Sequence, residues 1–97
     1  MTLASKLSPY FGSILRERGF QIYRARDVHF TRVAPDSVYA NVVGTMPYKV
    51  TIALRDGKLA LGCSCPYAES NGHCKHLWAV VLSASDREFL KQAAESQ

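Results

Sequence analysis

The sequence predicts an α+β fold in which an N-terminal helix is followed by an antiparallel sheet and then by two short C-terminal helices. Three observations predict this order. A helix-start signal stands at Ser8 and Pro9, β-branched and aromatic residues dominate residues 20–61, and apolar residues recur at helical spacing after Cys74.

The first helix is expected to begin at Ser8. A serine hydroxyl at the N-cap accepts backbone N–H groups, and Pro9 suits the first helical position, where no N–H partner is needed. Gly19 is expected to end this helix, because glycine is favoured just beyond a helix terminus. The apolar residues that fall on one face are Tyr10, Phe11, Ile14 and Leu15.

The middle of the chain is expected to form strands. The runs rich in β-branched and aromatic residues are Phe20 to Arg24, Val28 to Val33, Val38 to Val43 and Tyr48 to Arg55. Asp56-Gly57 predicts a tight hairpin, because both residues tolerate positive φ, and the return strand is expected from Lys58 to Leu61.

The C-terminal part is expected to be helical, with an apolar face made by Leu77, Trp78, Val81 and Leu82. Trp78, four residues after Cys74, is expected to pack in the core. Ser83-Ala84-Ser85 is expected to weaken this helix. The capping-box pattern from Ser85 to Glu88 predicts a second helix, with Phe89, Leu90, Ala93 and Ala94 on its apolar side.

Size and composition limit the possible classes of protein. Ninety-seven residues form one domain, because two halves would each be too small to stabilise a core. A hydrophobic content of 47% argues against a disordered chain. The longest helical-looking apolar run, Leu77 to Leu82, falls far short of the roughly 20 residues that cross a bilayer. The N-terminus also lacks the order of a signal peptide, so we expect a cytoplasmic chain.

Three cysteines lie close together: Cys63, Cys65 and Cys74. Their number is odd, so a closed set of disulfides would leave one thiol over, and an intracellular chain normally keeps its thiols reduced. With His76 they place four potential zinc ligands within fourteen residues. A structural zinc site uses four such ligands in a tetrahedron, which makes metal binding the leading interpretation.

The spacing of the ligands constrains the backbone. In an extended segment residues i and i+2 point to the same side, so Cys63 and Cys65 can both face a metal at the end of the hairpin. The same spacing on a helix turns side chains by about 200°, so Cys74 is expected at or before the helix start and His76 in its first turn. The helix N-terminus then favours thiolates.

Two alternatives to this ligand set stay open. His73 competes with His76 as the fourth ligand and would replace it if the loop turned differently. A redox or nucleophilic cysteine is also conceivable, but the two-residue redox spacing and an orienting acid are both missing. Buried free cysteines beside a surface histidine are a poor explanation for two matched pairs.

The order Cys63-Ser-Cys-Pro, spacer, Cys74-Lys-His-Leu-Trp-Ala-Val-Val-Leu resembles the SWIM-type zinc finger, a family named after Swi/Snf helicases and Mutator transposases. Gly44-Thr-Met-Pro-Tyr-Lys-Val and Arg18-Gly19-Phe20 also resemble the region before the finger in bacterial members. The resemblance implies one structural Zn²⁺ held by Cys63, Cys65, Cys74 and His76 on a ββα arrangement, at about residues 48–84 of a single domain spanning 1–97.

The resemblance further implies binding of DNA or protein instead of catalysis. In bacterial chains such a module often precedes a Swi/Snf-type helicase, so a helicase-like ATPase is an expected partner. The chain is either a module of a longer protein or a free-standing one. We expect neither a catalytic residue nor a small-molecule substrate. Four protein ligands complete the coordination sphere of the zinc ion, and no pair of carboxylates suggests acid–base chemistry.

The charge is compatible with DNA as the target. Lys and Arg number 12 against 8 Asp and Glu, giving a net charge of +4. The candidate phosphate contacts are Arg16, Arg18, Arg24, Arg26, Arg32 and Lys75. Tyr23, Tyr39 and Tyr48 are able to stack on bases, but tyrosines on strands are more often half-buried. The alternative function is a protein-interaction module that uses an apolar patch or a free strand edge.

Overall fold

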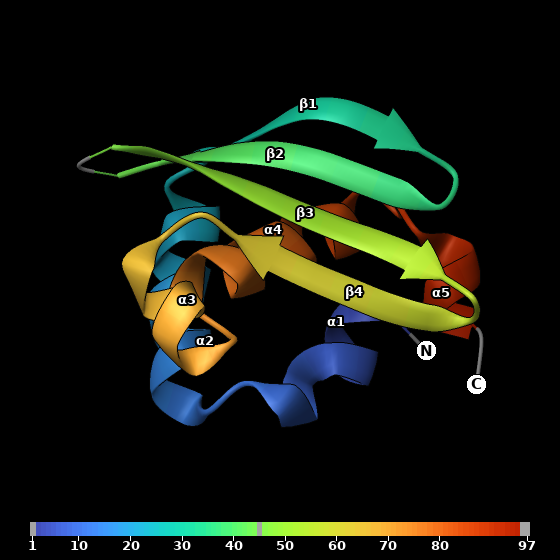
Figure 1. Cartoon of the computed structure of the whole chain (residues 1–97), viewed down its shortest axis with the longest axis horizontal. Helices are drawn as coiled ribbons and strands as arrows, with labels where there is room; N and C mark the ends of the chain where they lie inside the picture. Colours follow the sequence, from blue (N-terminus) through green and yellow to red (C-terminus); the bar gives the residue numbers. More distant parts are fainter. Residues whose placement is uncertain (1, 45, 96–97) are drawn as a thin grey trace.

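A four-stranded antiparallel sheet covered by helices on one side makes up the computed structural model, which describes residues 2–44 and 46–95 (Figure 1). The strands are β1 (Val28–Ala34), β2 (Ser37–Val43), β3 (Pro47–Arg55) and β4 (Lys58–Cys63), and they pair in chain order as a meander. The α+β prediction is confirmed, and all four strands expected from residue 28 onward are present. Thr45, which belongs to the segment before the finger, lies outside the described residues.

The β3–β4 hairpin has the turn expected from its sequence. Arg55 pairs with Lys58, and between them Asp56 and Gly57 take φ values of 52° and 76°. Two central residues with positive φ match the right-handed twist of the flanking strands. The hairpin therefore fixes the register in which Val50 faces Cys63 at the far end of β4.

The N-terminal region differs from the expectation. It contains α1 (Leu3–Leu7), a 3₁₀ turn η1 (Ser8–Tyr10) and α2 (Ser13–Arg24). The prediction of a helix from Ser8 to Gly19, followed by a strand over Phe20 to Arg24, is wrong, because α2 continues through Gly19 to Arg24. A Cβ atom at Gly19 would lie 2.7 Å from Trp78 Cδ1 and 2.8 Å from the Lys75 carbonyl oxygen. Gly19 thus serves the close approach of two helices and does not end one.

The C-terminal region also departs from the expected break. Helix α4 (Lys75–Asp86) runs unbroken through Ser83-Ala84-Ser85. Ser83 Oγ donates to the Ala79 carbonyl at 2.9 Å, and Ala84 is fully buried, so this segment is held in the helix by packing. The predicted helix start at Ser85 is therefore wrong. The chain instead turns after Asp86 and re-enters a helix as α5 (Lys91–Glu95).

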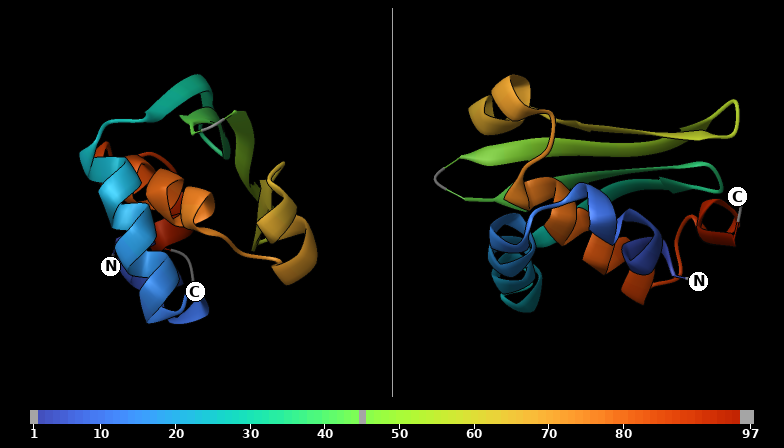
Figure 2. Two further views of the ribbon diagram at one scale, coloured as in Figure 1. Left: turned by 90° about the vertical axis from the view of Figure 1, so that its left-hand side faces the viewer. Right: turned by 90° about the horizontal axis from the view of Figure 1, so that it is seen from below.

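Helix α4 is the centre of the core. It lies between the sheet and α2 (Figure 2), which explains why it is apolar on nearly all sides. The inward side chains of the sheet that meet this layer are Val38, Val42, Val50 and Ile52, each at most 1% exposed. Trp78 also packs in the core, as expected, with its ring 5.1 Å from that of Phe11. The hydrophobic core therefore contains residues of the expected finger, which begins at about residue 48, and residues that precede it.

Candidate metal centre

The four potential ligands come from three element ends. Cys63 is the last residue of β4, Cys65 is the N-cap of α3 (Pro66–Asn71), and Cys74 is the N-cap of α4. His76 lies in the first turn of α4, as the spacing predicts. Helix α3 was not expected from the sequence, which predicts only a loop between the cysteine pairs.

These positions bring the ligand atoms together. The sulfur atoms of Cys63, Cys65 and Cys74 and a ring nitrogen of His76 all lie within 4.8 Å of one another. A tetrahedron with Zn–S bonds of about 2.3 Å has sulfur atoms about 3.8 Å apart, so only a small contraction onto an ion is required. Cys65, Cys74 and His76 are buried and Cys63 is half-buried, so most of the ligand cluster is sheltered from bulk water.

Helix N-termini supply part of the electrostatic environment. The Cys65 sulfur accepts the Ala68 backbone N–H at 3.3 Å, and the Cys74 sulfur accepts that of Leu77 at 3.5 Å. Backbone N–H groups at the start of a helix carry partial positive charge, and they stabilise thiolates. Both N–H···S hydrogen bonds therefore favour the thiolate form of these cysteines, which is the form that binds a metal cation.

The cysteines are also coupled to each other. A hydrogen bond from the Cys63 thiol lowers the pKa of Cys74 to about 4, although burial acts in the opposite direction. The same hydrogen bond, together with burial, raises the pKa of Cys63 above its ordinary value. Both sulfur atoms belong to the ligand cluster, whose atoms lie within 4.8 Å of one another, so they are close enough to bind one metal ion.

The two histidines have different surroundings. The His76 ring is packed 4.6 Å from the Tyr48 ring, and its Nδ1 lies 4.0 Å from the Cys63 sulfur. His73 instead makes an edge contact with Phe11, with ring centroids 5.0 Å apart, and it is not part of the ligand cluster. The geometry therefore favours His76 over His73 as the fourth ligand.

Three thiols and one imidazole that lie together in a mostly buried cluster fit one structural Zn²⁺ ion. Four protein ligands leave no position for a substrate or a reactive water. Zinc bound here would join the end of β4 to the starts of α3 and α4, and so would hold the sheet to the helical layer.

Comparison with known families decides the type of centre, because residues 48–85 match the SWIM zinc finger. We therefore identify this segment as a SWIM zinc finger. It comprises nearly all of β3, then β4, α3 and α4 up to its last turn, while α1, α2, β1 and β2 lie outside the match. SWIM fingers are binding modules. Neither a curated protein nor a solved structure matches the chain.

The six basic residues predicted to contact nucleic acid lie outside the metal centre, and all are exposed. Helix α2 contains Arg16, Arg18 and Arg24, and Arg26 follows it. Arg32 is on β1, and Lys75 is the first residue of α4. Arg16 donates to Ser8 Oγ at 3.0 Å, and the Arg32 guanidinium lies 5.9 Å from the centre of the Tyr39 ring.

Two of these six, Arg24 and Arg26, line the same cavity. The same cavity is lined by Arg87 and His29, which the sequence did not single out as binding residues. Arg87 lies far from Arg26 along the chain, and no local pattern connects them. The three tyrosines considered for base stacking, Tyr23, Tyr39 and Tyr48, are half-buried, as strand or helix residues usually are.

None of the helices in residues 2–44 and 46–95 is both long enough and apolar enough to cross a membrane.

Proposed function

We propose that this chain is a zinc-stabilised module that binds DNA through its exposed basic side chains. The observation that carries the proposal is the arrangement of Arg24, Arg26 and Arg32. These exposed arginines follow the chain from the last turn of α2 into β1, an edge strand of the sheet. Exposed arginines that follow one another closely along the chain suit a polyanion, whose phosphates repeat along a strand.

The zinc has a supporting role in this proposal. It stabilises the finger, and through α4 it stabilises the layer that positions α2. The basic side chains, not the metal, would contact the phosphates. Binding of this kind depends on counterion release, so the affinity must fall steeply with salt.

The test is fluorescence anisotropy with labelled single- and double-stranded DNA across a salt series, on protein of known zinc content. We expect log-linear weakening with salt in the wild type. The double variant Arg24→Ala/Arg32→Ala should reduce the magnitude of the salt slope by about two, because each lost phosphate contact reduces it by about one.

Arg55→Ala is the matched control, because it removes the same charge from an exposed residue at the end of β3. It should leave the slope within experimental error of the wild type. Absence of binding at low salt by folded, zinc-loaded protein would refute the DNA-binding function.

A second candidate function is protein binding, which a separate observation favours. A cavity of about 310 Å³ between η1 and the β3–β4 hairpin is lined partly by Leu54, Leu59 and Leu61. Beside it β4 is a sheet edge with pairing on one side only in the described sheet. Binding to a protein there would tolerate salt and survive loss of the arginines.

The partner and the location remain proposals of the same kind. A helicase-like ATPase is the proposed protein partner, on the strength of the finger's resemblance to modules that precede such enzymes. A reducing compartment such as the cytoplasm is proposed because three thiols must stay reduced to bind zinc.

A further inference from the structure

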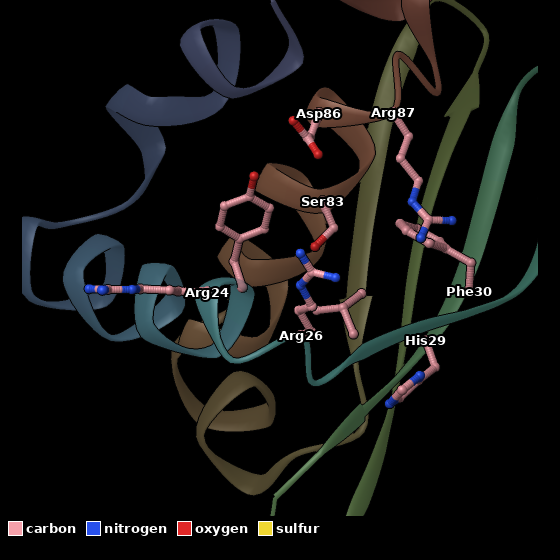
Figure 3. Close-up of a pocket in the computed structure, with 9 residues that line it drawn as sticks. Arg24, Arg26, His29, Phe30, Ser83, Asp86 and Arg87 are labelled. Atoms are coloured by element: carbon pink, nitrogen blue, oxygen red, sulfur yellow. The ribbon is translucent and has the colours of Figure 1, made fainter.

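A cleft of about 630 Å³ opens between the end of α2, the start of β1 and the last turn of α4 (Figure 3). It is separate from the zinc centre, and it lies outside the SWIM match except for Ser83. The lining side chains that carry charge or can gain it are Arg24, Arg26, His29, Asp86 and Arg87. Figure 3 shows the Arg24 side chain pointing away from the other lining side chains, so Arg26 and Arg87 against one carboxylate give the cleft a positive balance.

The charges are not mixed evenly within the cleft. In Figure 3, Asp86 lies at the upper end of the group of labelled side chains and His29 at its lower end, with Ser83 and Arg26 between them. Arg87 reaches into the side that holds His29 and Phe30. The part of the cleft around Arg26, Arg87 and His29 is therefore the part suited to an anion.

Arg26 occupies a backbone position that favours glycine. Its φ is 62°, and it follows the last residues of α2 with the bonds of a Schellman ending: Arg26 N–H donates to the Tyr23 carbonyl at 3.0 Å, and Asp27 N–H donates to that of Ile22 at 3.3 Å. A long side chain is unfavourable in this left-handed conformation. An arginine here thus lowers local stability while directing its guanidinium into the cleft.

Arg87 is held in place from the opposite wall. Its guanidinium lies over the Phe30 ring, 5.6 Å from the centroid, and Phe30 in turn packs edge-on against Phe89 at 5.1 Å. A guanidinium stacked on an aromatic face keeps its N–H edge available for an oxyanion. Arg26 and Arg87 together thus present donors from two elements that are distant in sequence.

We propose that this cleft binds a phosphodiester group of a DNA strand, with Arg26 and Arg87 as the two phosphate-binding side chains. The inference rests on the proposed DNA-binding function and locates its site. Guanidinium groups bind phosphate oxygens with paired N–H bonds. The volume lies within the range of ligand sites and leaves room for more than one phosphate. This multiplicity favours a strand over a ligand with a single phosphate.

The test uses zinc-loaded full-length chain with a labelled twelve-nucleotide strand and its duplex. Arg26→Gly should raise the melting temperature by about 4 °C, because it relieves the left-handed residue. It should nevertheless weaken DNA binding about tenfold and reduce the salt slope by about one. Arg87→Gln should weaken binding similarly, and the double variant should reduce the slope by about two. Arg55→Gln, the matched control, should change neither the affinity nor the slope.

A chemical arm tests the ligand itself. A strand of the same sequence with neutral methylphosphonate linkages should bind at least tenfold more weakly to the wild type, and this difference should shrink in the double variant. Arg26 and Arg87 side-chain N–H signals should shift on titration with the natural strand, and the Arg55 signal should not.

Each outcome bears on a distinct claim. If the wild type does not bind DNA, the DNA-binding function fails and the cleft proposal with it. Wild-type binding with an unchanged slope in the double variant would overturn the cleft alone and leave the function standing. Tighter binding of a phosphoserine peptide than of DNA, abolished by the same substitutions, would replace the strand with a protein ligand and overturn the proposal.

Discussion

Cys74 shows how one residue has two structural roles at the metal centre. It caps α4 through the Leu77 N–H, and its sulfur belongs to the four-atom ligand cluster. Cys74 is only 1% exposed, so a side chain substituted at this position would stay buried. A change here removes a metal ligand without opening the site.

We expect Cys74→Ser to lose stoichiometric zinc. Serine can still cap the helix, so loss of zinc would result from the missing thiolate ligand and not from a missing N-cap. Zinc contributes about 10–16 kcal/mol in finger peptides, which is as large as a typical domain stability, so the melting temperature should fall sharply. Zinc content by atomic emission and thermal unfolding by circular dichroism measure both effects.

His73→Ala is the matched comparison, because His73 lies one residue from Cys74 but outside the cluster. It should retain one zinc per chain and lose only its edge contact with Phe11. Zinc loss in His73→Ala with zinc retention in His76→Ala would reverse the assignment of the fourth ligand.

At the scale of elements, the crossing of α2 and α4 depends on Gly19. The missing side chain lets the backbone of α2 contact Trp78 and the carbonyl of Lys75, immediately beside the ligands Cys74 and His76. This crossing fixes the first turn of α4 from the side opposite the sheet. The non-finger part of the chain thereby supports the metal centre.

Gly19→Ala should destabilise the protein by about 1–3 kcal/mol, although alanine is the better helix former, because its methyl group would overlap Trp78 and a backbone carbonyl. Gly62→Ala is the control, since nothing lies within 4 Å of a Cβ atom at this position in β4 and its φ is not positive. Urea unfolding of both variants measures the difference. Equal stability of the two would show that the crossing relaxes without cost.

At the scale of the whole molecule, the SWIM finger and the rest of the chain share one core. Leu3, Leu7 and Phe11 belong to the same buried cluster as Trp78 and Val80. Strand β2, outside the finger, pairs along its length with β3 inside it. The finger is therefore not an appendage that can melt alone.

Removal of zinc by a chelator should consequently lower the stability of the entire chain in one cooperative transition. We expect near-ultraviolet and far-ultraviolet circular dichroism to lose signal together, with coincident midpoints. Two separated transitions, with β1 and β2 retained after the finger melts, would contradict a shared core.

Features that depend on neighbours along the chain could be predicted before the structure was known. The ligand pairs, the Asp56-Gly57 turn and the strands from residue 28 onward follow from short-range spacing and backbone preference, which operate within a few residues. His76 could be preferred over His73 by family resemblance, and the packing of the two rings then gave an independent reason.

Features that depend on segments far apart in the chain became visible in the folded molecule alone. Gly19 resembles a helix stop until Trp78 packs against it, and Ser83-Ala84-Ser85 resembles a break until the core surrounds Ala84. Arg26 and Arg87 meet across one cleft because α2 and α4 end on the same side of β1. Contacts between distant segments offset unfavourable local preferences, and no local pattern records which segments will meet.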